Sequence, residues 1–151
     1  RVTDNGRQRL YRDPIVARRE SAIQEIIVTR RVHPGGVIDT RLFLDGDLQL
    51  SSVDSHRYHE SLAHPVISLT SARRVLVLGG GDCVAVREVL RHPSVEHVTR
   101  VELDPEVTAM AEEVPELRAL NEGACSDPLV EVVNADAFTW VRAHARSDDR
   151  R

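Results

Sequence analysis

Lysine is absent from this 151-residue chain, and cysteine and aromatic residues are scarce. All 20 basic residues are arginines, and 24 acidic residues outnumber them, which gives a formal net charge of −4. This mild acidity argues against a nucleic-acid-binding protein, which needs a basic patch or stripe. No apolar run approaches the roughly 20 residues of a membrane span, and no signal peptide opens the sequence. With 41% apolar residues, the composition is that of one globular domain or part of one.

The two cysteines, Cys83 and Cys125, are too few for a disulfide framework or a metal-binding quartet. We therefore expect no disulfide framework, no bound metal, and a reducing compartment such as the cytoplasm, in which a disulfide is rare. The only methionine is Met110, and the sequence ends in a polar stretch. From these two features we expect a piece of a longer protein.

Residues 1–20 are charged and aperiodic, which predicts a leader or linker. The β-branched run within residues 23–29 predicts a strand. Asp45 and Gly46 stand between two apolar triplets, a hairpin signature because glycine tolerates the positive φ that the turn requires. Residues 21–52 are therefore expected to form a small antiparallel β unit.

Strands and helices alternate over residues 53–151. The expected strands are 75–78, 98–103 and 129–133, and the expected helices are 54–64, 84–90, one that begins at Pro105, and 137–145. The apolar run at 75–78 suits a parallel strand buried on both faces, and Pro65 is expected to end the first helix. This alternation predicts an α/β domain with a Rossmann-like parallel sheet.

Three glycines, Gly79, Gly80 and Gly81, join the first of these strands to a helix. Such a turn lets a ligand approach the backbone close to the free N–H groups of the helix. A tight strand-to-helix turn without a ligand is the alternative. Cys83 and Val84 occupy the end of the turn, where a dinucleotide fingerprint has its third glycine, so a pyrophosphate ligand is not favoured.

Acidic residues follow the ends of the next two strands. Glu102 stands 21 residues after Gly81, at a place where an acid accepts hydrogen bonds from ribose hydroxyls. Asp136, with the N–H of Ala137 beside it, is suited to accept from an adenine amino group. Because the carboxyl ends of parallel strands meet at one edge of a sheet, these acids predict an adenosine site.

Asp82 distinguishes between classes of nucleoside ligand. A carboxylate in this turn repels the amino-acid carboxylate of S-adenosylmethionine and attracts an ammonium group instead. Two unit charges about 4 Å apart interact by about 4 kcal/mol at an effective dielectric constant of about 20. We therefore expect a cationic nucleoside that lacks a carboxylate. Capping of the following helix is the alternative role for Asp82.

Tyr58 and His59 lie in the expected helix 54–64 and are suited to hydrogen-bond an amine and relay its proton. His56 and His59 stand three residues apart, but no matching third ligand is evident, so a metal site is not expected. A plain surface helix is the alternative for this segment.

Six motifs in order resemble the polyamine aminopropyltransferases, that is, the spermidine synthases. They lie at 21–24, 44–49, 58–60, 79–82 with 87–90, 101–104 and 136–138. The resemblance covers about residues 10–142 and is nearest to bacterial members whose catalytic domain follows a membrane-spanning region. It implies transfer of an aminopropyl group from decarboxylated S-adenosylmethionine, a co-substrate, to putrescine, with release of methylthioadenosine and no cofactor.

The resemblance also implies a role for each matching residue. Glu102 would hold the ribose, and Asp136 with Ala137 would hold the adenine. Asp82 would bind the aminopropyl ammonium or the polyamine. Gln24 would contact the methylthioadenosine part of the donor. Tyr58 and His59 would line the amine-acceptor channel, with Gln49 nearby.

The sequence departs from the family at several positions. Ile23 replaces a tyrosine, Ser55 a glutamate, and Cys83 and Val84 replace glycines. The family's general-base aspartate lies on a further strand that this sequence does not contain, so we expect the chain alone to be inactive. A methyltransferase that uses S-adenosylmethionine and a non-catalytic nucleoside-binding or assembly module are the alternatives. The expected partners are putrescine and further copies of the chain, as a dimer or tetramer, without nucleic acid.

Overall fold

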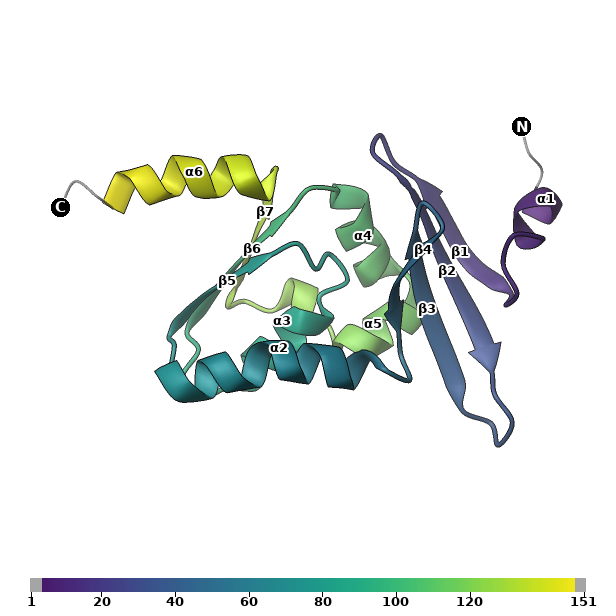
Figure 1. The fold of residues 1–151 in the computed structure, drawn as a ribbon, viewed down its shortest axis with the longest axis horizontal. Helices are drawn as coiled ribbons and strands as arrows, with labels where there is room; N and C mark the ends of the chain where they lie inside the picture. Colours follow the sequence, from purple (N-terminus) through teal and green to yellow (C-terminus); the bar gives the residue numbers. More distant parts are fainter. Residues whose placement is uncertain (1–3, 149–151) are drawn as a thin grey trace. The chain divides into compact units, whose positions relative to one another are not determined.

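The structure is a computed structural model that describes residues 4–148 of the chain (Figure 1). The chain divides into two compact units between Tyr58 and His59, inside one helix. Each unit has its own sheet, antiparallel in the first and parallel in the second.

The first unit contains a four-stranded sheet in the order β1-β2-β3-β4. Its elements are α1 (Asp4–Gln8), β1 (Ile15–Glu20), β2 (Glu25–Val32), β3 (Ile38–Leu44) and β4 (Asp47–Ser51). The expected hairpin is confirmed, because Asp45 and Gly46 connect β3 to β4 with φ angles of 49° and 89°. The β-branched run that predicted a strand supplies the core of this sheet, since Ile26, Ile27 and Val28 are fully buried.

The expectation of an aperiodic leader is wrong for residues 15–20. They form β1, which pairs antiparallel with β2 at the edge of the sheet. Charged residues hide this strand in the sequence, but they pair within the sheet, both across to β2 and along β1. Arg18 is 2.7 Å from Glu25 and 3.4 Å from Glu20. An antiparallel edge strand can face water on one side and accommodate such charges.

The second unit contains the parallel sheet β5-β6-β7, which confirms the Rossmann-like α/β prediction. Its strands are β5 (Arg74–Leu78), β6 (His97–Glu102) and β7 (Val130–Asn134). Its helices are α2 (Ser55–Thr70), which begins in the first unit, α3 (Val84–Leu90), α4 (Pro105–Glu113), α5 (Pro115–Asn121), the 3-10 turn η1 (Ala124–Ser126) and α6 (Ala137–Asp148). Elements α5 and η1 have no counterpart among the predicted elements.

The prediction that 75–78 is buried on both faces is wrong. Strand β5 lies at the edge of the sheet, and its side chains alternate between half-buried and exposed. Leu76 and Leu78 are 45% and 52% exposed. Only the central strand β6 is covered well enough to bury Val98, Arg100 and Val101 completely.

Helix α2 continues past Pro65 to Thr70, so the prediction that it ends at this proline is wrong. A proline inside a helix removes one backbone hydrogen bond and crowds the preceding turn, at a cost of about 3 kcal/mol or more. Ala63 and Ile67, on either side of Pro65, are buried in the core of the second unit with Val86 and Val98. Burial of this apolar face beyond the proline offsets the local cost. Among the described residues, no helix is both long enough and apolar enough to cross a membrane.

We predict that the chain self-associates through the open edge of β5. Leu62, Val66, Leu76 and Leu78 line an apolar groove of about 260 Å³ beside this strand. Apolar edge strands with unpaired backbone groups recruit further chains. Sedimentation velocity over a concentration series should show association, and Leu76→Lys should weaken it.

Leu69→Lys is the matched control, because Leu69 is 87% exposed on α2 and does not line the groove. This control should associate as the unmodified chain does. A concentration-independent monomer with a cooperative melting transition would contradict the prediction.

Candidate functional site

Three loops of the second unit meet at the carboxyl edge of the parallel sheet. The register pairs Leu78 of β5 with Val101 of β6, and Glu102 of β6 with Asn134 of β7. The segments that follow the strands therefore start side by side, and each carries acidic residues. This edge is where open α/β sheets bind ligands.

The glycine turn after β5 requires glycine for two different reasons. Gly79 and Gly80 have φ angles of 79° and 70°, in the left-handed region that side chains disfavour. Gly81 instead lacks space, because a Cβ there would lie 2.7 Å from Cγ1 of Val107 and 2.9 Å from Oε2 of Glu102. The absence of a side chain at Gly81 thus brings the turn directly against the Glu102 carboxylate.

Glu102 is held in place by the backbone that follows β6. Its side chain is largely buried, and Oε1 accepts a hydrogen bond of 3.0 Å from the N–H of Asp104. Asp104 in turn is the N-cap of α4, where it accepts a hydrogen bond of 3.0 Å from the N–H of Glu106. Asp104 is also buried, and its role here is to shape the loop.

The Asp82 carboxylate contacts the start of α3. Its Oδ1 accepts a hydrogen bond of 2.8 Å from the N–H of Val84, and its carbonyl accepts one of 3.1 Å from Nδ2 of Asn121. Asp82 thus serves the helix start as the capping alternative expected, although it stands one residue before the N-cap, Cys83, and binds the N–H of the first helical residue. This contact uses Oδ1 of the carboxylate, so it is compatible with the expected attraction of an ammonium group.

Asp136 stands after β7 and caps the last helix. Its Oδ1 accepts a hydrogen bond of 2.7 Å from the N–H of Thr139, and these contacts with Thr139 lower the pKa of Asp136. Ala137 is the first residue of α6. The preceding residue, Ala135, donates its N–H to the carbonyl of Glu102 at 3.0 Å, which ties this loop to the end of β6.

The remaining predicted site residues belong to one unit or the other. His59 lies in the second unit and is buried, whereas Tyr58, in the first unit, is 66% exposed; both are in α2. Gln49 is exposed in β4. Gln24 ends the turn before β2, where the Ser21 hydroxyl accepts a hydrogen bond of 2.9 Å from its N–H. Gln24 also lines a cavity of about 480 Å³ within the first unit.

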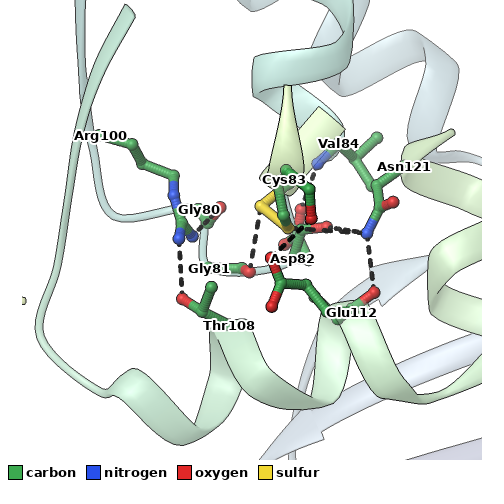
Figure 2. The surroundings of a disulfide bond; sticks show 12 residues. Gly80, Gly81, Asp82, Cys83, Val84, Arg100, Thr108, Glu112 and Asn121 are labelled. Carbon is green, nitrogen blue, oxygen red and sulfur yellow. Dashed lines mark hydrogen bonds between the residues drawn. A yellow bond between two sulfur atoms is a disulfide. The ribbon is translucent and has the colours of Figure 1, made fainter. Parts of the chain in front are cut away.

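Cys83 and Cys125 form a disulfide, contrary to the expectation of a compartment in which a disulfide is rare (Figure 2). Their Cα atoms lie 5.4 Å apart, and the bond joins the glycine turn to η1. The spacing of 42 residues along the chain hides this pairing in the sequence. Cys83 has a φ of 64°, in the left-handed region that favours glycine. The argument for a reducing compartment rested on unpaired cysteines and loses its basis.

Sequence reasoning missed three buried polar residues around the glycine turn, Arg100, Thr108 and Asn121 (Figure 2). Asn121 also donates to the carbonyl of Ala111 at 3.0 Å, which links the turn to α4. The one sequence signal was an arginine in the middle of an expected buried strand. Among residues 4–148, no group of histidine, cysteine and acidic side chains is arranged to hold a metal ion.

The alternating strands and helices, with the glycine turn and the acidic edge, define a Rossmann-like α/β domain. The sequence profile described as the Spermine/spermidine synthase domain matches residues 55–149. The chain belongs to this family, and the resemblance is confirmed.

Relatives and solved structures agree with this assignment. Polyamine aminopropyltransferase 1 of Streptomyces coelicolor is 55% identical over 91% of this chain, and the polyamine aminopropyltransferase of Mycobacterium tuberculosis is 50% identical over 95%. The crystal structure of spermidine synthase from Thermotoga maritima is 34% identical, with a TM-score of 0.74 over 85% of this chain and 43% of that one. A spermidine synthase in complex with the transition-state analogue AdoDATO matches equally well. The chain spans 26% of the length of both curated relatives.

We predict that reduction of the disulfide destabilises the second unit. A cross-link across 42 residues restricts the unfolded chain, and loop-closure entropy assigns this restriction up to about 4 kcal/mol. Urea denaturation with and without a phosphine reductant should show this loss in the free energy of unfolding.

Cys125→Ala is the control, because its unfolding curve should not respond to the reductant. Identical curves for the oxidised and reduced unmodified chain would contradict the prediction.

Proposed function

We propose that this chain forms the donor-binding part of a polyamine aminopropyltransferase. The enzyme would transfer an aminopropyl group from decarboxylated S-adenosylmethionine to putrescine and release methylthioadenosine. The contact of Gly81 with Glu102 carries the proposal, because it leaves a carboxylate at the strand edge with no side chain between it and the glycine turn. The family assignment and the names of the relatives support the reaction class.

In the proposed complex, the donor nucleoside lies along the carboxyl edge of β5, β6 and β7. Glu102 accepts hydrogen bonds from the ribose hydroxyls. Asp136 and the N–H of Ala137 recognise the adenine. Asp136 is ionised at neutral pH, as an ordinary aspartate is, and it therefore offers only acceptors, which suits the adenine amino group.

Asp82 attracts the ammonium of the aminopropyl group and disfavours a ligand carboxylate at the same place. This charge argument separates the proposal from a methyltransferase that uses S-adenosylmethionine, since that ligand retains its carboxylate. The comparisons do not favour the methyltransferase or the non-catalytic module either.

The roles of the remaining residues follow from the family resemblance, residue by residue. Tyr58 and His59 line the path of the acceptor amine, with Gln49 nearby, and Gln24 contacts the methylthioadenosine part of the donor. In the transfer, the neutral amine nitrogen of putrescine forms a bond to the carbon next to the sulfonium. The carbon–sulfur bond breaks, the thioether leaves neutral, and the new ammonium releases one proton. The protein contributes orientation and removal of protons from the amine.

We also propose that the whole protein acts on small molecules and assembles from several copies, without nucleic acid, metal or cofactor. The family's general-base aspartate is not in this sequence, so ligand binding tests this chain more directly than turnover does.

We predict that the chain binds methylthioadenosine and that Glu102→Gln weakens this binding. Loss of the charged acceptor should cost about 1.5–3 kcal/mol, or about a tenfold to 150-fold rise in Kd. Isothermal titration calorimetry measures the effect. Glutamine retains an acceptor for the N–H of Asp104, so the loop should persist.

Glu131→Gln on the exposed part of β7 is the matched control and should bind as the unmodified chain does. An unmodified chain that binds no methylthioadenosine would refute the proposed function.

We predict that Asp82→Asn weakens decarboxylated S-adenosylmethionine more than methylthioadenosine. Only the first ligand carries the ammonium, and its charge-assisted contact should be worth about 1.5–3 kcal/mol. Asparagine can still accept the hydrogen bond from the N–H of Val84, which preserves the cap. Equal losses for both ligands in calorimetry would assign Asp82 to capping alone.

A further inference from the structure

Arg100 is a fully buried arginine in the middle of the central strand β6. Its Nη2 donates a hydrogen bond of 2.8 Å to the hydroxyl of Thr108 on α4, and its Nη1 donates one of 3.4 Å to the carbonyl of Gly80 (Figure 2). The guanidinium therefore joins the strand, the glycine turn and the first half of α4. Glu102 follows two residues later on the same strand.

This arrangement is unfavourable for stability. Nε of Arg100 is buried and has no hydrogen-bond partner within residues 4–148, and no ion pair within 4 Å is formed by Arg100 in that range. Burial lowers the pKa of Arg100, and it outweighs the negative charges of Glu102, Asp82 and Glu112, which raise this pKa. A buried charge whose hydrogen bonds are incomplete is costly, and an apolar side chain of similar volume is often more stable.

Two of the three acids that offset this charge, Glu102 and Asp82, belong to the proposed donor site. Glu102 comes from the end of β6, Asp82 from the glycine turn and Glu112 from α4. The Gly80 carbonyl that Arg100 contacts also accepts a hydrogen bond of 2.9 Å from the N–H of Cys83, the residue after Asp82. Arg100 thus acts on the segment that presents both Gly81 and Asp82.

We propose that Arg100, held by Thr108, is a positioning residue that fixes the glycine turn for the donor nucleoside. This inference rests on the proposed function. The guanidinium fixes the Gly80 carbonyl through its hydrogen bond. Gly81 therefore stays against Glu102, and the Asp82 carboxylate stays at the start of α3. Its charge is retained for this geometry and not for the stability of the core.

The double variant Arg100→Met with Thr108→Val tests the proposal. It removes both hydrogen-bonding partners together, so neither is left buried without the other. We expect an unchanged or higher melting temperature and at least an approximately tenfold rise in Kd for methylthioadenosine by calorimetry. Arg100→Lys, which keeps a cationic donor, should recover part of the affinity.

A second measurement reads the turn without any ligand. Amide hydrogen exchange by NMR should be at least about tenfold faster at Cys83 in the double variant, because its N–H bonds to the Gly80 carbonyl. The Val98 amide of β6, which donates to the carbonyl of Leu129, is the internal control and should keep its rate.

Arg73→Met is the matched control for loss of one positive charge, because Arg73 is exposed and pairs with Glu96. It should retain the affinity of the unmodified chain. A double variant that binds with unchanged affinity and shows unchanged Cys83 exchange would overturn the proposal, as would a fall in melting temperature with uniformly faster exchange. If the unmodified chain binds no nucleoside, the proposed function fails, and the Cys83 exchange alone decides whether Arg100 orders the turn.

Discussion

The close approach of Gly81 to the Glu102 carboxylate is the constraint on which the candidate site depends. Any side chain at position 81 would collide with Glu102 and Val107, so the turn can follow β5 along this path only with glycine there. The parallel register places Glu102 beside the end of β5 and opposite Asn134 of β7. One steric condition thus brings a backbone turn and a carboxylate together at the edge where ligands bind to such sheets.

Charges of both signs lie around this contact. Asp82 and Asp136 each use one oxygen to accept a hydrogen bond from the first turn of a helix. Arg100, a buried cation, donates a hydrogen bond to the Gly80 carbonyl of the turn and is attracted by the carboxylates of Glu102 and Asp82. Helix capping and ligand recognition are compatible roles for a carboxylate, because it has two oxygens and about four acceptor directions.

The disulfide and Asn121 hold the same turn from another direction. Cys83 adopts the left-handed conformation that a glycine would adopt easily, and its bond to η1 anchors it there. Asn121 adds hydrogen bonds to the Asp82 carbonyl and to α4. The turn is therefore held by covalent and polar contacts from residues that are distant in the sequence.

The sequence by itself determined the alternation of strands and helices, the Asp45–Gly46 hairpin and the acids at the strand ends, because these depend on local periodicity and turn chemistry. Six ordered motifs also sufficed for the family. Only the tertiary structure decided the rest. Charged side chains concealed β1, whose evidence is its pairing with β2. Pro65 stayed inside α2 because Ile67 is buried beyond it. Cys83 and Cys125, and likewise Arg100 and Gly80, meet only through folding, and a contact between distant residues leaves no periodic trace in a single sequence.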